Sequence, residues 1–93
     1  MKSYAEITTT QAARIAKRLV NHWKHKFAVD ETATQWCIHL PAAQVLLVAH
    51  EQHLTVEIDY QTAEANPDQL EHVVLDHLER MGQSPIEAHW HRA

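Results

Sequence analysis

The chain has 93 residues, 45% of them hydrophobic and only one a glycine, and its formal net charge is -4 with neutral histidines. This length suits one domain, residues 1–93, whose modest core is too shallow for a deep enclosed active site. The negative charge argues against a nucleic-acid partner, which selects a basic stripe, and the lone glycine excludes a glycine-rich phosphate loop.

Cysteine content and hydropathy favour a soluble cytoplasmic protein. Cys37 is the single cysteine, so neither an intramolecular disulfide nor a cysteine-rich zinc site can form. No apolar run of the signal-peptide kind follows Met1 and Lys2, and the longest apolar stretch, residues 45–49, is too short to span a membrane. We therefore expect no membrane partner.

The first third of the chain predicts a strand, a helix and a second strand. Residues 4–8 alternate and favour a strand, after which the threonines at 8–10 offer N-caps. Apolar residues recur at helical spacing between 11 and 26, which predicts a helix; they are Ala12, Ile15, Ala16, Leu19 and Trp23. Residues 27–29 then favour a short strand, and residues 30–33 a turn.

Three further strands are predicted in the middle of the chain. Residues 35–40 alternate until Pro41 ends the run, and Trp36, Ile38 and Leu40 share one face. Residues 44–49 form a second apolar run, and the polar residues 50–53 predict a hairpin tip. Residues 54–60 then alternate, with one apolar face made of Leu54, Val56, Ile58 and Tyr60.

A second helix is predicted from Pro67 to Gly82. Asn66 suits the N-cap, proline suits the first helical position, and glycine is a stop signal. The inward stripe comprises Leu70, Val73, Val74, His77, Leu78 and Met81. After Pro85, residues 86–91 alternate again and predict a last strand, with Ile86, Ala88 and Trp90 on one face and Glu87, His89 and His91 on the other.

The predicted order is β-α-β-β-β-β-α-β. Strands follow one another in hairpin runs, so the sheet should be mainly antiparallel. Each clear strand has one apolar face, so we predict an α+β fold in which two helices pack on one face of a single sheet.

Two segments carry a resemblance to a known family. They are residues 21–27, NHWKHKF, and residues 73–80, VVLDHLER, and a terminal strand ending near Trp90 fits as well. On these segments nearly the whole chain resembles the bacterial family called domain of unknown function 2218. The resemblance implies a compact α+β domain in the bacterial cytoplasm without an assigned activity. Some such domains resemble accessory proteins of iron-siderophore systems.

Histidine is the unusual residue, with nine copies. His22 and His25 are three apart on the predicted first helix, close enough to bind one metal ion through their imidazoles. Zinc sites normally need three or four protein ligands, so two imidazoles alone make a weak site. The alternative is structural: His22 packs at the edge of the apolar stripe, and His25 is a favourable cation near a helix C-terminus.

His77 lies in the middle of the second helix's apolar stripe, where we expect burial. A buried imidazole favours its neutral form and needs a hydrogen-bond partner. It is therefore either a core histidine bonded to a backbone carbonyl or to the first helix, or a ligand or acid-base group lining a pocket between helices and sheet. If the helices lie side by side, His22 and His77 form a pair.

The remaining histidines divide into two groups. His39, His89 and His91 share the face opposite the core, and with Cys37, Glu57 and Asp59 could form a mixed cluster, a solvated face or a dimer interface. Nothing near Cys37 in sequence lowers the pKa of its thiol. We assign no role to His50, His53 and His72.

We predict an accessory protein that binds a metal ion, a metal complex of the iron-siderophore kind or a small aromatic ligand. The predicted ligand-binding residues are His22, Trp23, His25, Lys26 and His77. Of these, His22, His25 and His77 are the predicted metal ligands, with Zn, Fe, Cu or Ni as the candidate cofactor. The alternative is a homodimeric interaction module without a small-molecule site. An enzyme with His77 as its acid-base group is least favoured, because no nucleophile or cofactor motif is present.

Overall fold

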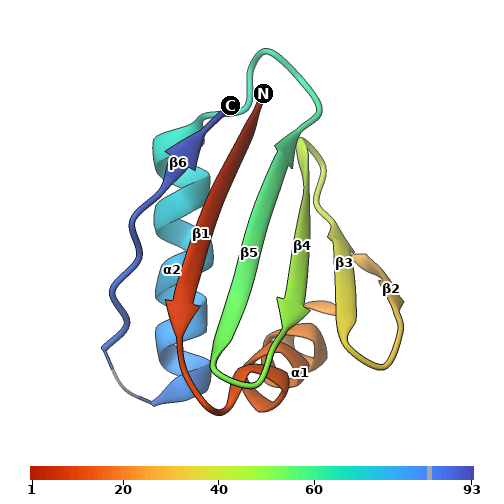
Figure 1. Cartoon of the computed structure of the whole chain (residues 1–93). Coiled ribbons are helices and arrows are strands. Elements are labelled where there is room, and N and C mark those ends of the chain that lie inside the picture. The colour runs from red at the N-terminus through yellow and green to blue at the C-terminus, as the bar shows by residue number, and fades with distance from the viewer. Residues whose placement is uncertain (84) are drawn as a thin grey trace.

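A computed structural model describes residues 1–83 and 85–93 of the chain. The elements follow the predicted order β-α-β-β-β-β-α-β (Figure 1). They are β1 (Lys2–Thr8), α1 (Ala12–Trp23), β2 (Ala28–Glu31), β3 (Gln35–His39), β4 (Ala43–Ala49), β5 (His53–Tyr60), α2 (Pro67–Gly82) and β6 (His91–Arg92).

All the strands join one sheet in the order β2-β3-β4-β5-β1-β6, and every neighbouring pair is antiparallel. Hairpins connect β2 to β5 in sequence, whereas β1 lies against the far side of β5 and β6 against the outer edge of β1. The two ends of the chain therefore meet: the amide of Lys2 donates to the carbonyl of Ala93 at 2.8 Å, and the reverse bond is 2.9 Å. The antiparallel prediction is confirmed.

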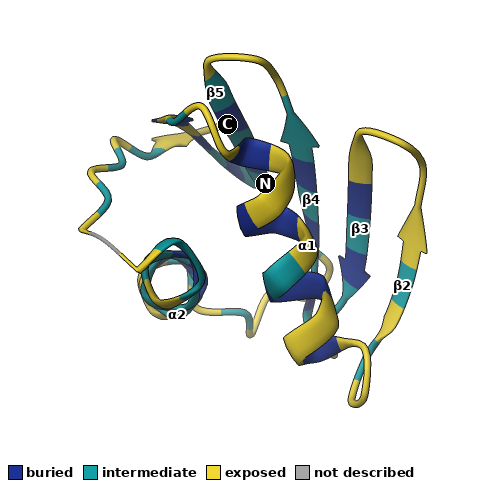
Figure 2. Ribbon diagram, turned by 90° about the horizontal axis from the view of Figure 1, so that it is seen from below, coloured by how far each residue is buried: buried dark blue, intermediate teal, exposed yellow. Residues whose placement is uncertain are grey.

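One face of the sheet carries both helices, as predicted (Figure 2). Helix α1 contacts β3, β4 and β5, and α2 contacts α1 and β5. Alternate strand residues are buried beneath them, among them Ile7, Trp36, Ile38, Val45, Leu47, Leu54, Val56 and Ile58. Each such side chain contributes roughly 1.5–3 kcal/mol when it leaves water, so this layer is the main source of stability. No helix of the described chain covers the opposite face.

Helix α1 is shorter than predicted at its C-terminal end. The amides of Lys26 and Phe27 both donate to the carbonyl of Trp23, at 2.9 and 3.0 Å, so the chain turns there instead of continuing as a helix to residue 26. This turn sets the ring of Phe27 edge-on to Trp23, with centroids 6.2 Å apart. The predicted threonine cap is wrong, since Gln11 occupies the N-cap position without a side-chain cap bond.

Helix α2 begins and ends where the sequence predicts. Asn66 accepts the amide of Gln69 through Oδ1 at 3.1 Å, which satisfies one of the free donors of the first turn. At the other end the left-handed residue is Gln83, with φ 57°, so Gly82 is the last helical residue and not the turn itself. A Cβ at Gly82 would lie 3.3 Å from Cδ1 of Ile15, so the glycine lets the two helices approach closely.

Two predicted boundaries are wrong. The predicted turn at 30–33 begins later, because Asp30 and Glu31 pair with Cys37 and Trp36 as part of β2. Of the predicted strand 86–91 only His91 lies in a strand of the described residues, where it forms β6 together with Arg92. The segment nevertheless keeps the two predicted faces: apolar residues 86, 88 and 90 are partly buried, and polar residues 87 and 89 are exposed.

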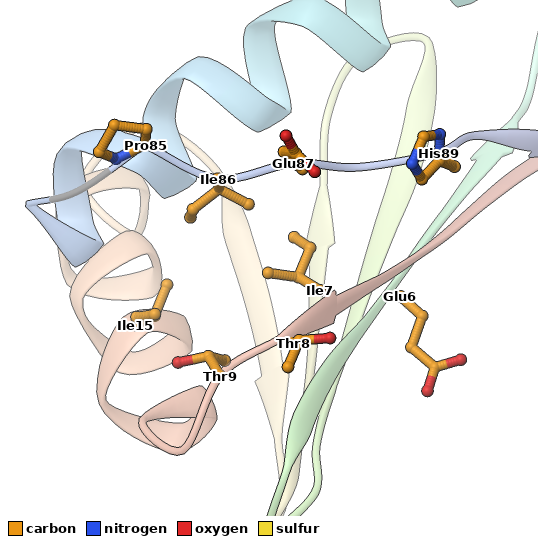
Figure 3. A pocket seen from close by; sticks show the side chains of 9 residues that line it. All are labelled: Glu6, Ile7, Thr8, Thr9, Ile15, Pro85, Ile86, Glu87 and His89. Carbon is orange, nitrogen blue, oxygen red and sulfur yellow. The ribbon is translucent and has the colours of Figure 1, made fainter.

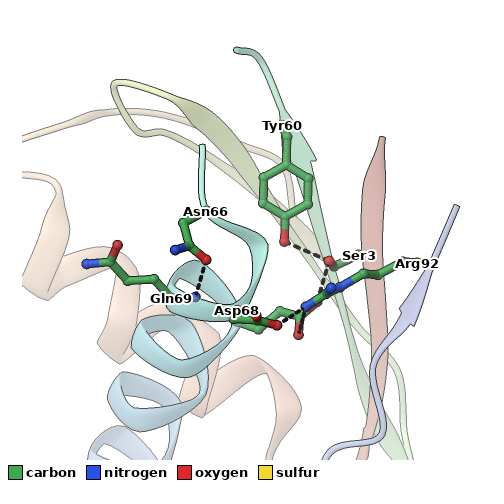
Figure 4. A network of polar contacts seen from close by, with 7 residues as sticks. Ser3, Tyr60, Asn66, Asp68, Gln69 and Arg92 are labelled. Atoms are coloured by element: carbon green, nitrogen blue, oxygen red, sulfur yellow. Dashed lines mark hydrogen bonds and ion pairs between the residues drawn. The ribbon is translucent and has the colours of Figure 1, made fainter. Parts of the chain in front are cut away.

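A polar network holds β6 in place (Figure 4). Two nitrogens of Arg92, Nε and Nη2, donate to the two carboxylate oxygens of Glu71, at 2.9 and 3.1 Å, and Arg92 also pairs with Asp68. Ser3 donates to Glu71 at 2.6 Å, so the 2.6 Å contact between Ser3 and Tyr60 has the tyrosine hydroxyl as donor. The network ties the last strand, the first strand and α2 together.

Candidate functional site

An apolar groove lies where the end of α1, the turn between β3 and β4, and α2 meet. Its volume is about 420 Å³, which falls in the range of small-molecule sites, roughly 300–1,000 Å³. The lining residues are Trp23, Lys26, Phe27, Leu40, Pro41, Ala42, Leu70, Val73 and His77. Aromatic and aliphatic walls with a few polar groups are the usual makeup of a ligand site.

His77 is half-buried and lines this groove. Its Nδ1 lies 2.7 Å from the carbonyl oxygen of Val73, one turn earlier on the same helix. A carbonyl only accepts, so Nδ1 carries the proton, and in the neutral ring Nε2 has a free lone pair. Among the described residues no hydrogen bond uses that Nε2, and no buried side-chain nitrogen or oxygen lacks a partner. The predicted backbone-carbonyl partner is confirmed, and the second nitrogen is free for a ligand.

Two aromatic rings of α1 lie against His77. The centroid of Trp23 is 4.9 Å from that of His77, and the centroid of His22 is 5.6 Å away. Trp23 is buried, so it fixes one side of the imidazole, whereas His22 is exposed. The two imidazoles are thus neighbours across the two helices, which is the arrangement that the hypothesis of a paired site requires.

His25 and Lys26 follow in the turn after α1, and both are exposed. Lys26 lines the groove and places a positive charge at its rim. Within residues 1–83 and 85–93, no group of three histidine, cysteine or acidic side chains is placed to hold a metal ion. The three predicted metal ligands, His22, His25 and His77, therefore do not converge on one site in this structure.

Most of the groove walls were not among the predicted site residues. Phe27, Leu40, Pro41, Leu70 and Val73 come from three different segments, and each resembles ordinary core or turn sequence on its own. The spacing of Trp23 and Phe27 was one available signal, because residues four apart in a helical turn lie on the same side, and the amide of Phe27 does bond the carbonyl of Trp23.

Of the three alternatives for the opposite face, the mixed cluster does not form among the described residues. His39 lies on β3 and His91 on β6, and four strand spacings of roughly 4.8 Å separate these strands in the sheet. His39 instead bonds Asp30 at 2.7 Å and Gln44 at 3.2 Å, and both partners belong to strands beside β3. His39 is therefore remote from His89 and His91, which line one shallow pocket together.

Cys37 is not an activated thiol. Burial raises the pKa of its thiol, and the carboxylates of Asp30, Asp59 and Glu57 raise the pKa further by opposing a thiolate. A thiol held protonated is a poor nucleophile and a poor metal ligand.

The fold and the groove define a small α+β domain with a ligand-sized opening between its helices and one end of its sheet. The family described as "Uncharacterized protein conserved in bacteria (DUF2218)" matches residues 4–91, and the chain belongs to this family. The resemblance seen in residues 21–27 and 73–80 is thereby confirmed.

One solved structure shares the fold throughout. The chain is 34% identical to the protein in the NMR structure of PA4090 from Pseudomonas aeruginosa, with a TM-score of 0.77, and the match covers 99% of this chain and 96% of that one. No protein with a curated description matches. Neither helix of the described residues has the length and hydropathy that a membrane crossing requires.

Proposed function

We propose that this protein is a binding module that holds a compact, mostly apolar ligand with an acidic group in the groove beside His77. The observation that carries the proposal is the composition of the groove, in which apolar walls meet one cation, Lys26, and one free imidazole nitrogen. A site of this kind selects by shape and by a few polar contacts.

The groove residues suggest how such a ligand binds. Trp23 and Phe27 offer aromatic surface for a flat ring, and the ammonium of Lys26 pairs with a carboxylate. Nε2 of His77 accepts a hydrogen bond from a ligand donor. Because the groove is open on one side, we expect modest affinity, with a Kd of about 0.1–1 mM for a probe of naphthalene size.

An NMR titration with 2-naphthoate tests the proposal. We expect saturable shifts at the indole N–H of Trp23 and at the amides of Phe27 and Val73. In Lys26→Met the affinity for 2-naphthoate should fall about threefold, because the lysine is exposed, while that for the uncharged 2-naphthalenemethanol is unchanged. Lys17→Met is the matched control, since Lys17 is equally exposed on α1 and does not line the groove. Shifts scattered over the surface, or the same loss in both variants, would contradict the proposal.

A second candidate ligand is a metal complex, which the 5.6 Å separation of the His22 and His77 rings favours. Two imidazoles are too few for a bare Zn, Fe, Cu or Ni ion, but they can fill the open positions of a metal that brings its own chelator. Nickel nitrilotriacetate, which leaves two positions open, is the probe.

We expect calorimetry to show 1:1 binding of this probe, with loss of binding in His22→Ala and in His77→Ala. His25→Ala is the matched control and should bind normally. Equal loss in all three variants would remove this candidate.

The homodimeric interaction module remains the alternative to a ligand site. It is supported by the sheet face that no helix of the described chain covers, where Tyr4, Cys37 and Leu46 are half-buried. Sedimentation that gives a monomer at every concentration would contradict it. We also keep the bacterial cytoplasm as the expected location, because the single cysteine gives no structural disulfide.

A further inference from the structure

The outer edge of β1 is only half paired. Strand β6 pairs with it at two positions, Ser3 with Arg92 and Tyr4 with His91. From Ala5 to Thr8, no strand of the described chain lies on that side of β1. An unpaired strand edge presents free backbone donors and acceptors, which readily pair with another strand.

The direction of the free groups follows from the bonds nearby. The amide of Thr9 donates to Gln52 at 3.1 Å, toward the β5 side, whereas the backbone of Lys2 bonds Ala93 on the β6 side. These directions alternate along an antiparallel strand, so the N–H and C=O groups of Glu6 and Thr8 face the β6 side. In the described part of the chain, no backbone bond from residues 85–90 reaches them.

The segment that precedes β6 runs beside this edge and leaves a cavity of about 300 Å³ (Figure 3). Ile7, Ile15 and Ile86 form its apolar part, and Thr8 and Glu87 lie among its polar lining. Both ends of the segment are held, by α2 before it and by the ion pair of Arg92 with Glu71 after it. The segment is thus tethered close to an edge that it does not bond.

The register of β6 matches the free edge when it is continued. Each step along β1 from the pair Tyr4–His91 moves one step back along the C-terminal segment. Glu6 then faces His89, Ile7 faces Ala88, and Thr8 faces Glu87. The odd-numbered positions of this part of β1 are buried, and the partners they would meet are the apolar ones. If the pairing shifted by one residue, the apolar side chains of the segment would face solvent and its polar side chains would face the core.

The side chains of the segment already face the correct way. Ile86, Ala88 and Trp90 are partly buried against the core, and Glu87 and His89 are exposed. Pairing therefore requires that the segment moves sideways onto the edge without turning over. We propose that the free edge of β1 is a strand-docking site and that its occupant is the chain's own segment from Glu87 to Trp90.

In the docked form β6 extends from residue 87 to residue 92 and the cavity beside Ile7 closes. Two further hydrogen-bonded pairs form, Glu6 with His89 and Thr8 with Glu87, and they protect the edge from other chains. In the undocked form the edge is open. The segment from Glu87 to Trp90 thus covers the edge of β1 in one form and exposes it in the other.

Disulfide trapping in a Cys37→Ser background tests the register. Hydrogen-bonded antiparallel pairs have Cα atoms roughly 5.5 Å apart, within the range of a disulfide. Glu6→Cys with His89→Cys, and Thr8→Cys with Glu87→Cys, should each form an intramolecular disulfide under mild oxidation. Glu6→Cys with Glu87→Cys is two residues out of register and should react at least tenfold more slowly. All four positions are exposed, so the variants should fold.

Two outcomes would overturn the proposal. Disulfide-linked dimers in the two in-register variants would make a second copy the occupant, and equal rates in all three variants would mean that no register exists. Hydrogen exchange on the unmodified chain gives an independent answer. The amides of Glu6 and Thr8 should exchange at least tenfold more slowly than that of Glu51 at the exposed hairpin tip, and equal exchange would overturn docking.

Discussion

Two parts of the C-terminal segment lie along the same strand and behave differently. At residues 91–92 the chain forms β6 against β1, whereas at residues 85–90 it runs beside β1 without bonding it. Only the unpaired part alternates between apolar and polar residues, since His91 and Arg92 are both polar and exposed, so alternation is not what produces pairing. The difference is Arg92, which reaches the carboxylate of Glu71 on α2. Alternation decides which side chains of the segment face the core, whereas the ion pair of Arg92 with Glu71 decides which part of the segment pairs with β1.

The anchor is strong because Glu71 is ionised. Burial alone would raise the pKa of Glu71, which is only 8% exposed, but hydrogen bonds from Arg92 and Ser3 outweigh burial and hold the pKa below its ordinary value of 4.5. Hydrogen bonds to a charged group are about twice as strong as neutral ones. Glu87 and His89, in the unpaired part, are exposed and have no comparable buried partner among the described residues.

Glu71→Ala should detach residues 91–92 from β1, so that they no longer differ from the unpaired residues 85–90. Without the carboxylate, Arg92 and Ser3 lose their shared acceptor, and we expect the free energy of unfolding to fall by about 2 kcal/mol. Urea denaturation measures the loss, and faster amide exchange at Lys2 and Ala93 would show that β6 has detached.

Asp68→Asn is the matched control for this variant. Asp68 also pairs with Arg92, but its side chain is 87% exposed, so the pair is worth no more than about 0.5 kcal/mol. Equal losses from Asp68→Asn and Glu71→Ala would show that burial of the carboxylate does not matter.

Ser3→Ala should weaken the anchor less. Ser3 is fully buried and joins Tyr60 to Glu71, so its removal breaks two hydrogen bonds but leaves the ion pair with Arg92. We expect a loss of about 1 kcal/mol in the free energy of unfolding, measured in urea. Thr8→Ala, on the same strand but exposed, should change stability by less than about 0.5 kcal/mol. A loss equal to that of Glu71→Ala would make the serine, not the ion pair, the centre of the network.

The ion pair between Arg92 and Glu71 should also weaken in acid. Because the pKa of Glu71 is lower in the folded chain than in the unfolded chain, its contribution is fully present above the ordinary value of 4.5 and is lost as pH falls through the folded pKa. Glu71→Gln removes the carboxylate and with it this pH-dependent contribution to the free energy of unfolding. The difference in unfolding free energy between the wild type and Glu71→Gln should therefore be constant near neutral pH and shrink below pH 4.5. A difference independent of pH would mean that the pKa of Glu71 is not shifted.

The sequence predicted the sheet well because local pattern decides it. Alternation in residues 35–40 and 54–60 fixed which side chains face the core, and helical spacing fixed both helices to within a few residues. The predicted strand 86–91 failed over residues 86–90 because alternation cannot report whether a neighbouring edge is bonded. Its pairing depends on Arg92 and Glu71, which are 21 residues apart and both read as surface charges.

The candidate site was predictable only in part. His22, Trp23 and His77 could be paired because helical periodicity places them on facing sides of α1 and α2. The turn after Trp23 could not be foreseen, since nothing in Lys24–Lys26 forbids a helix, and this turn moves Lys26 to the groove and leaves His25 outside it. The walls from Leu40 and Pro41 depend on tertiary packing, which no local pattern contains.

Gly82→Ala should have the smallest effect and tests how closely the end of α2, just before the unpaired part, packs on α1. Alanine favours the helix by up to about 1 kcal/mol, less at its last residue, but its Cβ would lie 3.3 Å from Ile15 and 3.8 Å from Ile86. The nearer atom, Cδ1 of Ile15, is the end of a flexible side chain, so the two effects should nearly cancel, with a net change within about 0.5 kcal/mol.

Combining Gly82→Ala with Ile15→Val, which removes that nearer atom, should convert the change into a small gain relative to Ile15→Val alone. The atoms that remain near the new Cβ, Cγ1 of Ile15 at 3.6 Å and Cδ1 of Ile86 at 3.8 Å, lie at ordinary van der Waals distances. If Gly82→Ala still destabilises the chain in that background, a steric contact with α1 or with the segment before β6 is not the cause, and the backbone at the end of α2 is what opposes alanine.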